Sequence, residues 1–203
     1  MTVLSLKLND PSHYTVTFDN GAQVRSTLNA VTDCRISEGK CLSQDEYDGF
    51  VYASERSMCM EHAVRLLSLR PMSRKELAKK LTEKGEDRDI SENVSERMAE
   101  LGLIDELSYS RAVVRHYAEK GFGRSRIISE LIRRGIPRDL FEEALEEMPD
   151  QEDKIDSFIR KRLTDPGDRK EIKKISDALF RKGYSWSEIR AAFERVGEDL
   201  NEY

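Results

Sequence analysis

The chain has 203 residues, of which 38% are hydrophobic and 36% are charged, and its formal net charge is -5 at pH 7. This length suffices to bury a core without disulfides or metals, and the charged fraction is above the roughly 25% of an average globular protein, as expected for helices with wide solvated faces. The sequence has no run of 18 apolar residues and no basic start followed by an apolar leader, so we expect neither a membrane span nor secretion, and a cytoplasmic location.

Residues 1–56 are expected to form a small β-rich N-terminal domain with one helix. Apolar and polar residues alternate between positions 3 and 24, which predicts short strands. The pair Asn20-Gly21 predicts a hairpin, because these residues tolerate the positive φ angles of tight turns. Residues 43–46 read Ser-Gln-Asp-Glu, a capping-box sequence that predicts a helix from there to about Tyr52.

The rest of the chain repeats a helical pattern at a spacing of about 50 residues. In each copy two aliphatic residues four positions apart are followed by a basic residue and then by a glycine, which predicts the end of a helix in the left-handed conformation. The closing glycines are Gly85, Gly135 and Gly183, and a further aliphatic residue follows thirteen positions after each, at Met98, Met148 and Val196. Helix starts are indicated by Ser73, Pro137 and Ser185.

This pattern predicts a mainly α fold in which three tandem three-helix modules, nine helices in all, follow the β-rich domain. The modules are expected at residues 57–103, 104–149 and 150–203. Each unit would bury its apolar face on its neighbours, so we expect an elongated, solenoid-like array. The alternative is that the copies share no more than the cap residues that are common to helical proteins.

The second module carries the most specific motif. Residues 101–106 read Leu-Gly-Leu-Ile-Asp-Glu and are followed by Tyr109 and Ala112, and residues 123–127 read Gly-Arg-Ser-Arg-Ile. This pattern resembles the core signature of the RecX family, which are regulators of the RecA recombinase. The sequence departs from the family at Leu107 and Ser108, where a further charged residue is usual, and this departure concerns local surface chemistry.

The resemblance extends over nearly the whole chain. Residues 70–77, which include Arg70-Pro71, Ser73 and Glu76-Leu77, are similar to the opening of the family's first module. Residues 39–46 are similar to a segment that follows the β-rich extension of longer members. The third module is more divergent, and there the resemblance rests on residues 181–184, Arg-Lys-Gly-Tyr, and on the apolar spacing.

What the resemblance implies is a non-catalytic regulator that binds RecA and its filament on single-stranded DNA and inhibits its ATPase and strand exchange. The alternative is a direct DNA-binding protein with helix-turn-helix-like modules, but the last helix of each module is acidic or mixed in charge, which suits a phosphate-lined groove poorly. We expect weak, non-specific DNA binding, a monomer and no membrane contact. The residues expected to maintain the modules are Gly85, Gly102, Asp105, Tyr109, Gly135 and Gly183.

Charge is distributed in bands along the second and third modules. Residues 111–138 contain eight basic and two acidic side chains, whereas residues 139–153 contain eight acids and no base. Cations could bind DNA phosphates, with release of counterions, or an acidic protein surface. The candidate partner-binding or DNA-binding residues are Arg115, Lys120, Arg124, Arg126, Arg133, Arg134, Lys173, Lys174, Arg181 and Lys182. Those just before a closing glycine are also favoured there by the helix dipole, by about 0.3 to 1 kcal/mol.

Other features have ordinary explanations. The acidic stretch 139–153 could mimic DNA or bind a basic patch, but an exposed, solvated helix is the more common reason for such a stretch. Tyr109 and Tyr117 share a helix face and are expected in the core, although these rings, Phe122 and Trp186 could also stack on bases. The three cysteines lack a C-x-x-C spacing, the three histidines are isolated and no phosphate-binding loop is present. We therefore expect no metal, no cofactor and no enzymatic activity.

Overall fold

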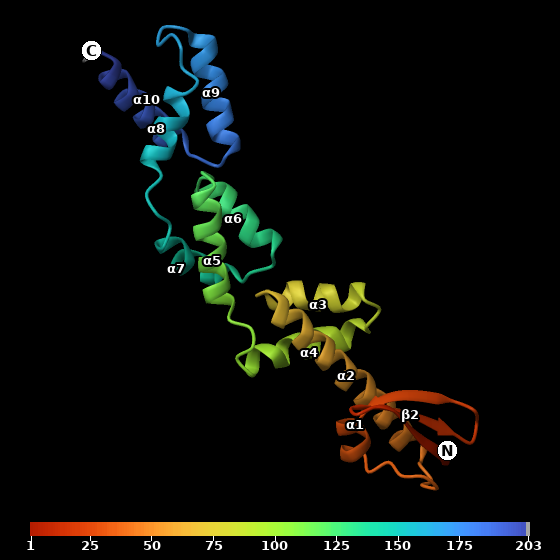
Figure 1. The fold of residues 1–203 in the computed structure, drawn as a ribbon. Helices are drawn as coiled ribbons and strands as arrows, with labels where there is room; N and C mark the ends of the chain where they lie inside the picture. The colour runs from red at the N-terminus through yellow and green to blue at the C-terminus, as the bar shows by residue number, and fades with distance from the viewer. Residues whose placement is uncertain (202–203) are drawn as a thin grey trace. The chain divides into compact units, whose positions relative to one another are not determined.

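The computed structural model of the chain describes the backbone of residues 1–201 and the side chains of residues 1–197 (Figure 1). It is mainly helical, with a three-stranded antiparallel sheet near the N-terminus, as the sequence predicts. The chain divides into two compact units, residues 1–104 and the residues from 105 onward. Among the described helices, none has both the length and the apolar character that a membrane crossing requires.

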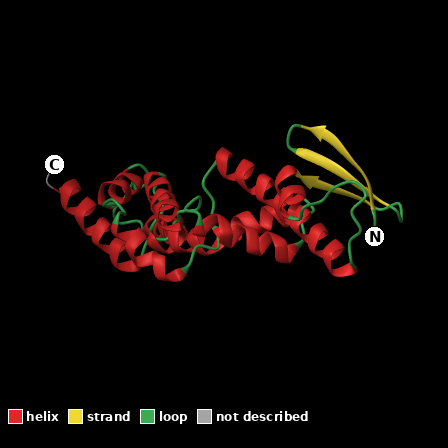
Figure 2. Cartoon of the chain, turned by 90° about the horizontal axis from the view of Figure 1, so that it is seen from below, coloured by secondary structure: helices red, strands yellow, loops and turns green. Residues whose placement is uncertain are grey.

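The sheet is built from β1 (Val3–Asp10), β2 (His13–Phe18) and β3 (Gln23–Thr27), in that order. The predicted hairpin joins β2 to β3, and Gly21 adopts a positive φ of 82° in its turn. Helix α1 (Leu28–Asp33) follows directly, capped by the Thr27 side chain. Figure 2 shows the strands as one sheet beside the helices of the first unit, and Val3, Val16 and Phe18 pack in a common core with Phe50.

Helix α2 (Gln44–Leu69) is longer than the sequence predicts. The capping box of Ser43 and Glu46 is confirmed at its start, but the helix continues for 26 residues and does not end near Tyr52. The reason is that residues 50–69 contain neither glycine nor proline. The expected boundary between residues 56 and 57 therefore lies inside a continuous helix, which ends only at the approach to Pro71.

One helix thus serves two cores in the first unit. Phe50, near the start of α2, packs with the sheet, whereas Cys59, Ala63 and Leu66 pack with α3 (Arg74–Glu83) and α4 (Arg88–Glu100). The second core also contains Leu77, Leu81, Val94 and Met98. Gly85 ends α3 with a φ of 95°, as predicted, and Gly102 ends α4 in the same left-handed conformation with a φ of 72°.

The second unit contains two further sets of helices, each around its own core. The middle set is α5 (Glu106–Glu119), α6 (Arg124–Arg133), the 3-10 turn η1 (Arg138–Leu140) and α7 (Phe141–Glu146), and the helices α2 to α4 of the first unit are called the first set. The last set is α8 (Glu152–Arg160), α9 (Arg169–Arg181) and α10 (Trp186–Asn201). Their centres are the buried residues Val114, Ile127, Leu131 and Ala144, and Ile159, Leu179, Ala192 and Val196. Over the described residues, α2 to α10 are the nine helices that the repeat predicts.

The third helix of the middle set departs from the predicted pattern. Pro137 precedes a 3-10 turn, and the α-helix begins only at Phe141. Because α7 ends at Glu146, Met148 lies beyond the helix, although its side chain still packs against the core. The thirteen-residue spacing therefore marks a core position in this set without marking a helix.

Candidate functional site

The acidic stretch after residue 138 partners part of the basic band before it. Arg111 and Arg115 lie one turn apart on α5, and Glu143 on α7 and Glu147 at its C-cap face them. The Arg111 guanidinium lies 2.8 Å from Glu143, and Arg115 pairs with Glu147. These contacts connect the first and last helices of the middle set, so partner binding by Arg115 would compete with an existing ion pair.

Glu130 organises a second group of the predicted cations. Its side chain is only 6% exposed and accepts hydrogen bonds from Arg133 at 2.6 Å and from Arg134 at 2.7 Å. Hydrogen bonds from Arg133 above all, and from Arg134 and Tyr117, lower the pKa of Glu130 to about 2, although burial opposes them. Arg134 also binds the hydroxyl of Tyr109, which is buried as expected. Arg134 is therefore occupied in holding α6 against α5.

Helix α6 has an unusual N-terminus. Its cap residue, Gly123, provides no side-chain hydrogen bond, yet the first amides of a helix need acceptors. The Gly123 amide donates to the Lys182 carbonyl at 2.9 Å, and the Ser125 amide donates to the Gly183 carbonyl at 3.1 Å. The carbonyls at the C-terminal end of α9 thus cap α6, and two segments about 60 residues apart in the sequence meet through their backbones.

Two lysines of the last helix set also bind the end of α5 in the middle set. Lys182 donates to the Gly121 carbonyl at 3.3 Å and lies 4.9 Å from the centre of the Phe122 ring. Lys154 donates to the Ala118 carbonyl at 2.7 Å. Both therefore bind carbonyls in the last turn of α5 or just after it, where the helix dipole favours a cation. Lys182 is consequently a structural contact between the two sets of helices.

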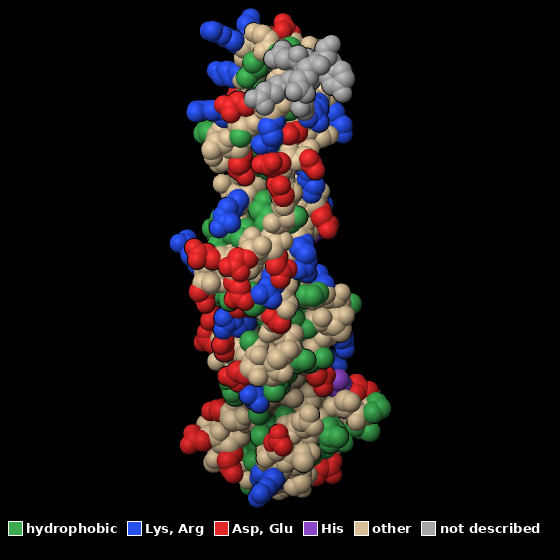
Figure 3. Space-filling model, turned by 90° about the vertical axis from the view of Figure 1, so that its left-hand side faces the viewer, with side chains coloured by type: hydrophobic (Ala, Val, Ile, Leu, Met, Phe, Trp, Pro, Cys, Tyr) green, Lys and Arg blue, Asp and Glu red, His purple; other side chains and the backbone are tan. Residues whose placement is uncertain are grey.

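The remaining predicted cations are more available. Arg124 and Arg126 at the start of α6, Lys173 and Lys174 on α9, and Arg181 at its end are exposed. Within the described part of the chain, none of these five side chains forms an ion pair or hydrogen bond, although Lys174 interacts electrostatically with Glu171. The Gly123–Gly183 junction brings the start of α6 to the end of α9. Over α8 to α10, Lys and Arg side chains project from one edge of the surface in Figure 3. We call Arg124, Arg126, Lys173, Lys174 and Arg181 the open cations.

Lys120 and Arg133 are intermediate cases. The Lys120 ammonium lies 5.9 Å from the centre of the Tyr117 ring, a cation–π contact that leaves the side chain exposed. Arg133 pairs with Glu130 but is 69% exposed. Both could contact a partner while they keep these interactions.

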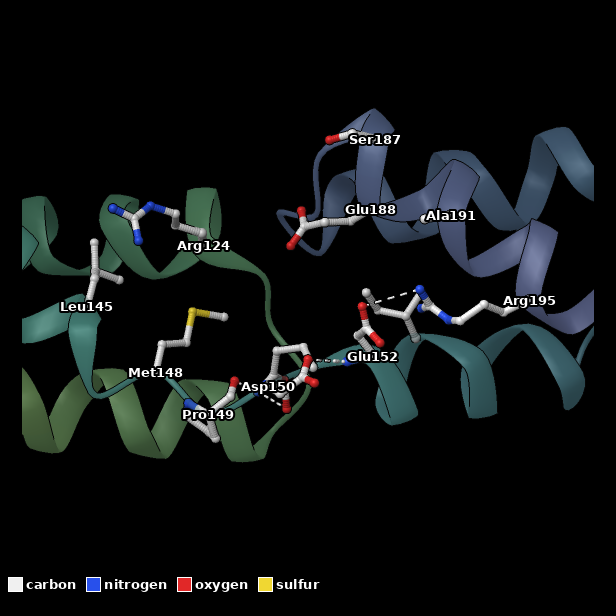
Figure 4. Close-up of a pocket in the computed structure, with 12 residues that line it drawn as sticks. Arg124, Leu145, Met148, Pro149, Asp150, Glu152, Ser187, Glu188, Ala191 and Arg195 are labelled. Carbon is white, nitrogen blue, oxygen red and sulfur yellow. Dashed lines mark hydrogen bonds and ion pairs between the residues drawn. The ribbon is translucent and has the colours of Figure 1, made fainter.

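A cleft of about 530 Å3 lies between the two helix sets of the second unit (Figure 4). Glu188 and Arg195 of α10 face Met148 and Pro149 across it, with Asp150 and Glu152 on its floor. Arg195 is paired with Asp156 at 2.9 Å and with Glu152 at 3.3 Å. Asp150, Glu152 and Glu188 line it together with the paired Arg195 and the unpaired Arg124, so the cleft has no charge preference of the kind that a phosphate site needs.

No catalytic or metal-binding geometry accompanies these surfaces among the described residues. No group of three His, Cys, Asp or Glu side chains there could hold a metal ion. Cys59 is fully buried, and desolvation raises the pKa of its thiol to about 12, which makes it a poor nucleophile. The arrangement can therefore bind, through charge and shape, but the described residues offer no activated group.

Sequence reasoning missed several residues that organise this surface. In the sequence Glu130 is only one acid within the basic band, and Lys154 follows the acidic run without any local signal. Gly123 belongs to the family motif, but the sequence does not show that it needs a bare backbone. The available signal is a second glycine two positions after Gly121, and the structure shows that Gly123 itself has no positive φ.

Comparison with known proteins identifies the first helix set, α2 to α4, and the middle set, α5 to α7. The model of the first three-helix domain of RecX matches residues 59–98, and the model of the second matches residues 105–145. The regulatory protein RecX of Halorhodospira halophila is 35% identical over 145 residues, which cover 68% of this chain and 87% of that protein. The regulatory protein RecX of Caldanaerobacter subterraneus is 28% identical over 158 residues, or 77% of this chain and 80% of that protein.

Solved structures agree with the fold. A crystal structure of regulatory protein RecX superimposes with a TM-score of 0.75 at 19% identity, over 97% of this chain and 98% of that chain. The crystal structure of RecX from Lactobacillus salivarius gives a TM-score of 0.64 at 25% identity, over 71% of this chain and 98% of that chain. The first comparison shows a shared fold along almost the whole length. The domain matches and the identity to curated relatives go further, and the chain belongs to the RecX family of regulatory proteins.

Proposed function

We propose that the chain is a non-catalytic regulator that binds RecA and the RecA filament on single-stranded DNA, and that it lowers the filament's ATPase and strand-exchange activity. The observation that carries this proposal is membership of the RecX family, through two matched three-helix domains and a relative that is 35% identical. Surface binding without an activated nucleophile or a metal cluster among the described residues is consistent with such a role.

We place the contact at the open cations of the second unit. Arg124 and Arg126 lie on α6 and are joined to the end of α9, which carries Arg181, by the Gly123–Gly183 junction. These side chains have no internal carboxylate to give up, so binding to an acidic protein surface or to phosphates would break no ion pair. Arg115 and Arg134, which are paired, are less suited to the contact.

Direct DNA binding is the second candidate, and the same open cations favour it. Phosphate contacts would give weak and strongly salt-dependent affinity without sequence preference. A helix-turn-helix mode is less well supported, because α7 is short, and Glu143 on it and Glu147 at its end pair with Arg111 and Arg115 of α5. Sequence-specific footprints on duplex DNA without RecA would favour this second candidate over the first.

The test is a titration into RecA strand-exchange and DNA-dependent ATPase assays at two salt concentrations. The double variant Arg124→Glu/Arg126→Glu should inhibit less than the unaltered protein, with the same helical content by circular dichroism. A matched control is Arg88→Glu/Arg97→Glu, which makes the same charge change on α4, where both arginines form exposed ion pairs of small energetic weight.

The outcomes separate the parts of the proposal. Full inhibition by the Arg124→Glu/Arg126→Glu variant would remove these two residues from the contact. Equal loss in both double variants would mean that net charge alone matters, and not the α6–α9 junction. If the unaltered protein does not attach to RecA at moderate salt, the proposed function itself is wrong.

A further inference from the structure

The last helix set exposes two large aromatic rings in mutual contact. Phe180, in the last turn of α9, is 51% exposed, and Trp186, at the start of α10, is 53% exposed. Their ring centres lie 5.1 Å apart with an angle of 19° between the planes, so the rings are stacked. Burying such rings in the core is the usual outcome, and a contiguous exposed apolar patch often marks a binding site.

The fold itself does not require these two rings. The core of this set is filled by other side chains, among them Ile159, Leu179 and Ile189, which are at most 2% exposed. Counted from the closing glycines, the positions equivalent to Phe180 and Trp186 hold Ile132 and Arg138 in the middle set. In the first set they hold Thr82 and Arg88. Three similar helix sets therefore form with and without an aromatic pair.

An apolar groove continues from the aromatic pair between α9 and α10. It has a volume of about 420 Å3 and is lined by Leu163, Pro166, Ile172, Trp186, Ile189 and Phe193, among others. This size is within the range of small-ligand sites, roughly 300 to 1,000 Å3, so a planar heterocycle fits. Arg190, one turn after Trp186, lines the groove and is exposed.

The charge around the groove is positive on α9 and mixed elsewhere, because the described part of α10 carries Glu188 and Glu194 as well as Arg190 and Arg195, and the loop before α9 carries Asp165 and Asp168. Helix α9 carries five basic residues and two acids, and one of these acids, Glu171, is held by Thr164 at 2.7 Å. Lys173, Lys174 and Arg181 on α9 are exposed and belong to the open cations. The partner that this surface fits therefore combines a flat, apolar face with repeated negative charge.

We propose that the groove between α9 and α10 binds single-stranded nucleic acid, with bases stacked on the Phe180–Trp186 pair and phosphates at the cations of α9 and Arg190. Single strands expose the faces of their bases, whereas a duplex buries them, so the site selects single strands. A protein helix could also cover an apolar groove, but the excess of cations on α9 favours a polyanion. This site rests on direct DNA binding, the second candidate function, and refines it, because stacked bases and a preference for single strands are added to the phosphate contacts; it does not depend on RecA.

The sequence offers a direct probe, because Trp186 is its only tryptophan. An oligothymidine of about 15 nucleotides, near the upper size of a single-strand site, is titrated into the protein while the tryptophan fluorescence is recorded. The control probe is an abasic deoxyribose-phosphate chain of the same length and charge. We expect strong quenching by the oligothymidine and little by the abasic chain.

Variants then assign the binding to the ring pair. Phe180→Ala keeps the fluorophore and should weaken oligothymidine binding by about fivefold to 100-fold, the effect of losing one stacked base. Ile132→Ala is the matched control, because Ile132 is the equivalent residue of the middle set and is 49% exposed. It should leave binding unchanged. Trp186→Ala is measured with a labelled oligonucleotide by fluorescence anisotropy, and it should weaken binding similarly.

Three results would overturn the site. Equal affinity for the oligothymidine and the abasic chain would mean that cations alone bind. Absence of quenching by either probe would mean that no strand reaches the ring pair. Quenching by RecA without DNA, and not by the oligonucleotide, would identify the groove as a protein-docking surface.

Discussion

Gly123 and Gly183 approach each other so closely that neither position has room for a side chain. A Cβ atom at Gly123 would lie under 3.0 Å from the Gly183 carbonyl, and one at Gly183 would lie equally close to the Arg126 backbone amide. The two glycines therefore allow the carbonyls at the end of α9 to cap α6. The contact that joins the two helix sets of the second unit is thus made by backbone groups.

Gly183→Ala is expected to destabilise the second unit by more than the replacement of a glycine at positive φ usually does. A non-glycine residue at positive φ costs about 1 to 2 kcal/mol, and here the added methyl group would also push the two backbones apart. Gly85→Ala is a matched control, since Gly85 has the same φ of 95° but nothing within 4 Å of its Cβ position. Urea unfolding measures both losses, and hydrogen exchange at the Gly123 and Ser125 amides should speed up only in Gly183→Ala. Equal losses would contradict the close-approach argument.

Glu130→Gln should lower the free energy of unfolding at pH 7 by about 2 kcal/mol. The reason is that Arg133 and Arg134 now donate to a buried, charged carboxylate and would face a neutral amide in the variant. The pKa of Glu130 is lowered to about 2 from 4.5, so its contribution is complete above about pH 4.5 and disappears as the pH falls toward 2. Unfolding by urea at pH 7, 4 and 2.5 should show the variant approaching the unaltered protein. Glu119→Gln, at an exposed position of the same set, should show no such convergence.

Asp105→Ala should cost about 1 kcal/mol, because Asp105 caps α5 by accepting hydrogen bonds from the Ser108 amide at 2.9 Å and hydroxyl at 2.7 Å. The hydrogen bond from the Ser108 amide is the main reason that the pKa of Asp105 lies below its usual value of 3.8. The contribution is therefore present above that value and is lost as the pH falls through the folded-state pKa. Asp105→Asn keeps an acceptor and should retain most of the stability at pH 7. A loss as large as that of alanine would argue that the charge, and not the cap, matters.

His13 connects the sheet to α2 through hydrogen bonds to Asp10 and Glu61, both at 2.8 Å. The bond to Asp10 first, and that to Glu61 second, raise the pKa of His13 above 6.5. A raised pKa stabilises the fold below pH 6.5, and this contribution disappears as the pH rises through the folded-state value. The thermal midpoint of the first unit should therefore fall between pH 6 and 9, and the fall should be smaller in His13→Gln. His116→Gln, at an exposed position in the second unit, is the control. An unchanged pH profile in His13→Gln would exclude this contact as the cause.

Much of the local structure follows from the sequence because it depends on single residues with special backbone or capping requirements. Gly85, Gly135 and Gly183 end helices at positive φ, and Ser43 and Ser185 begin helices through capping boxes, all as predicted. A φ angle or a cap is decided within a few residues of the chain, so a short pattern is enough to predict it.

The candidate surface depended on the tertiary structure. The sequence separates the ten candidate cations only by whether they precede a closing glycine. Packing pairs Arg115 with Glu147 and Arg134 with Glu130, binds Lys182 to the Gly121 carbonyl and leaves the five open cations unpaired. The same holds for the bare backbone of Gly123 and for the exposure of Phe180 and Trp186. The sequence alone determined where the helices stop and start, because those signals are local. Only the folded chain decided which charges are neutralised and which rings stay exposed, because both depend on which helix faces meet.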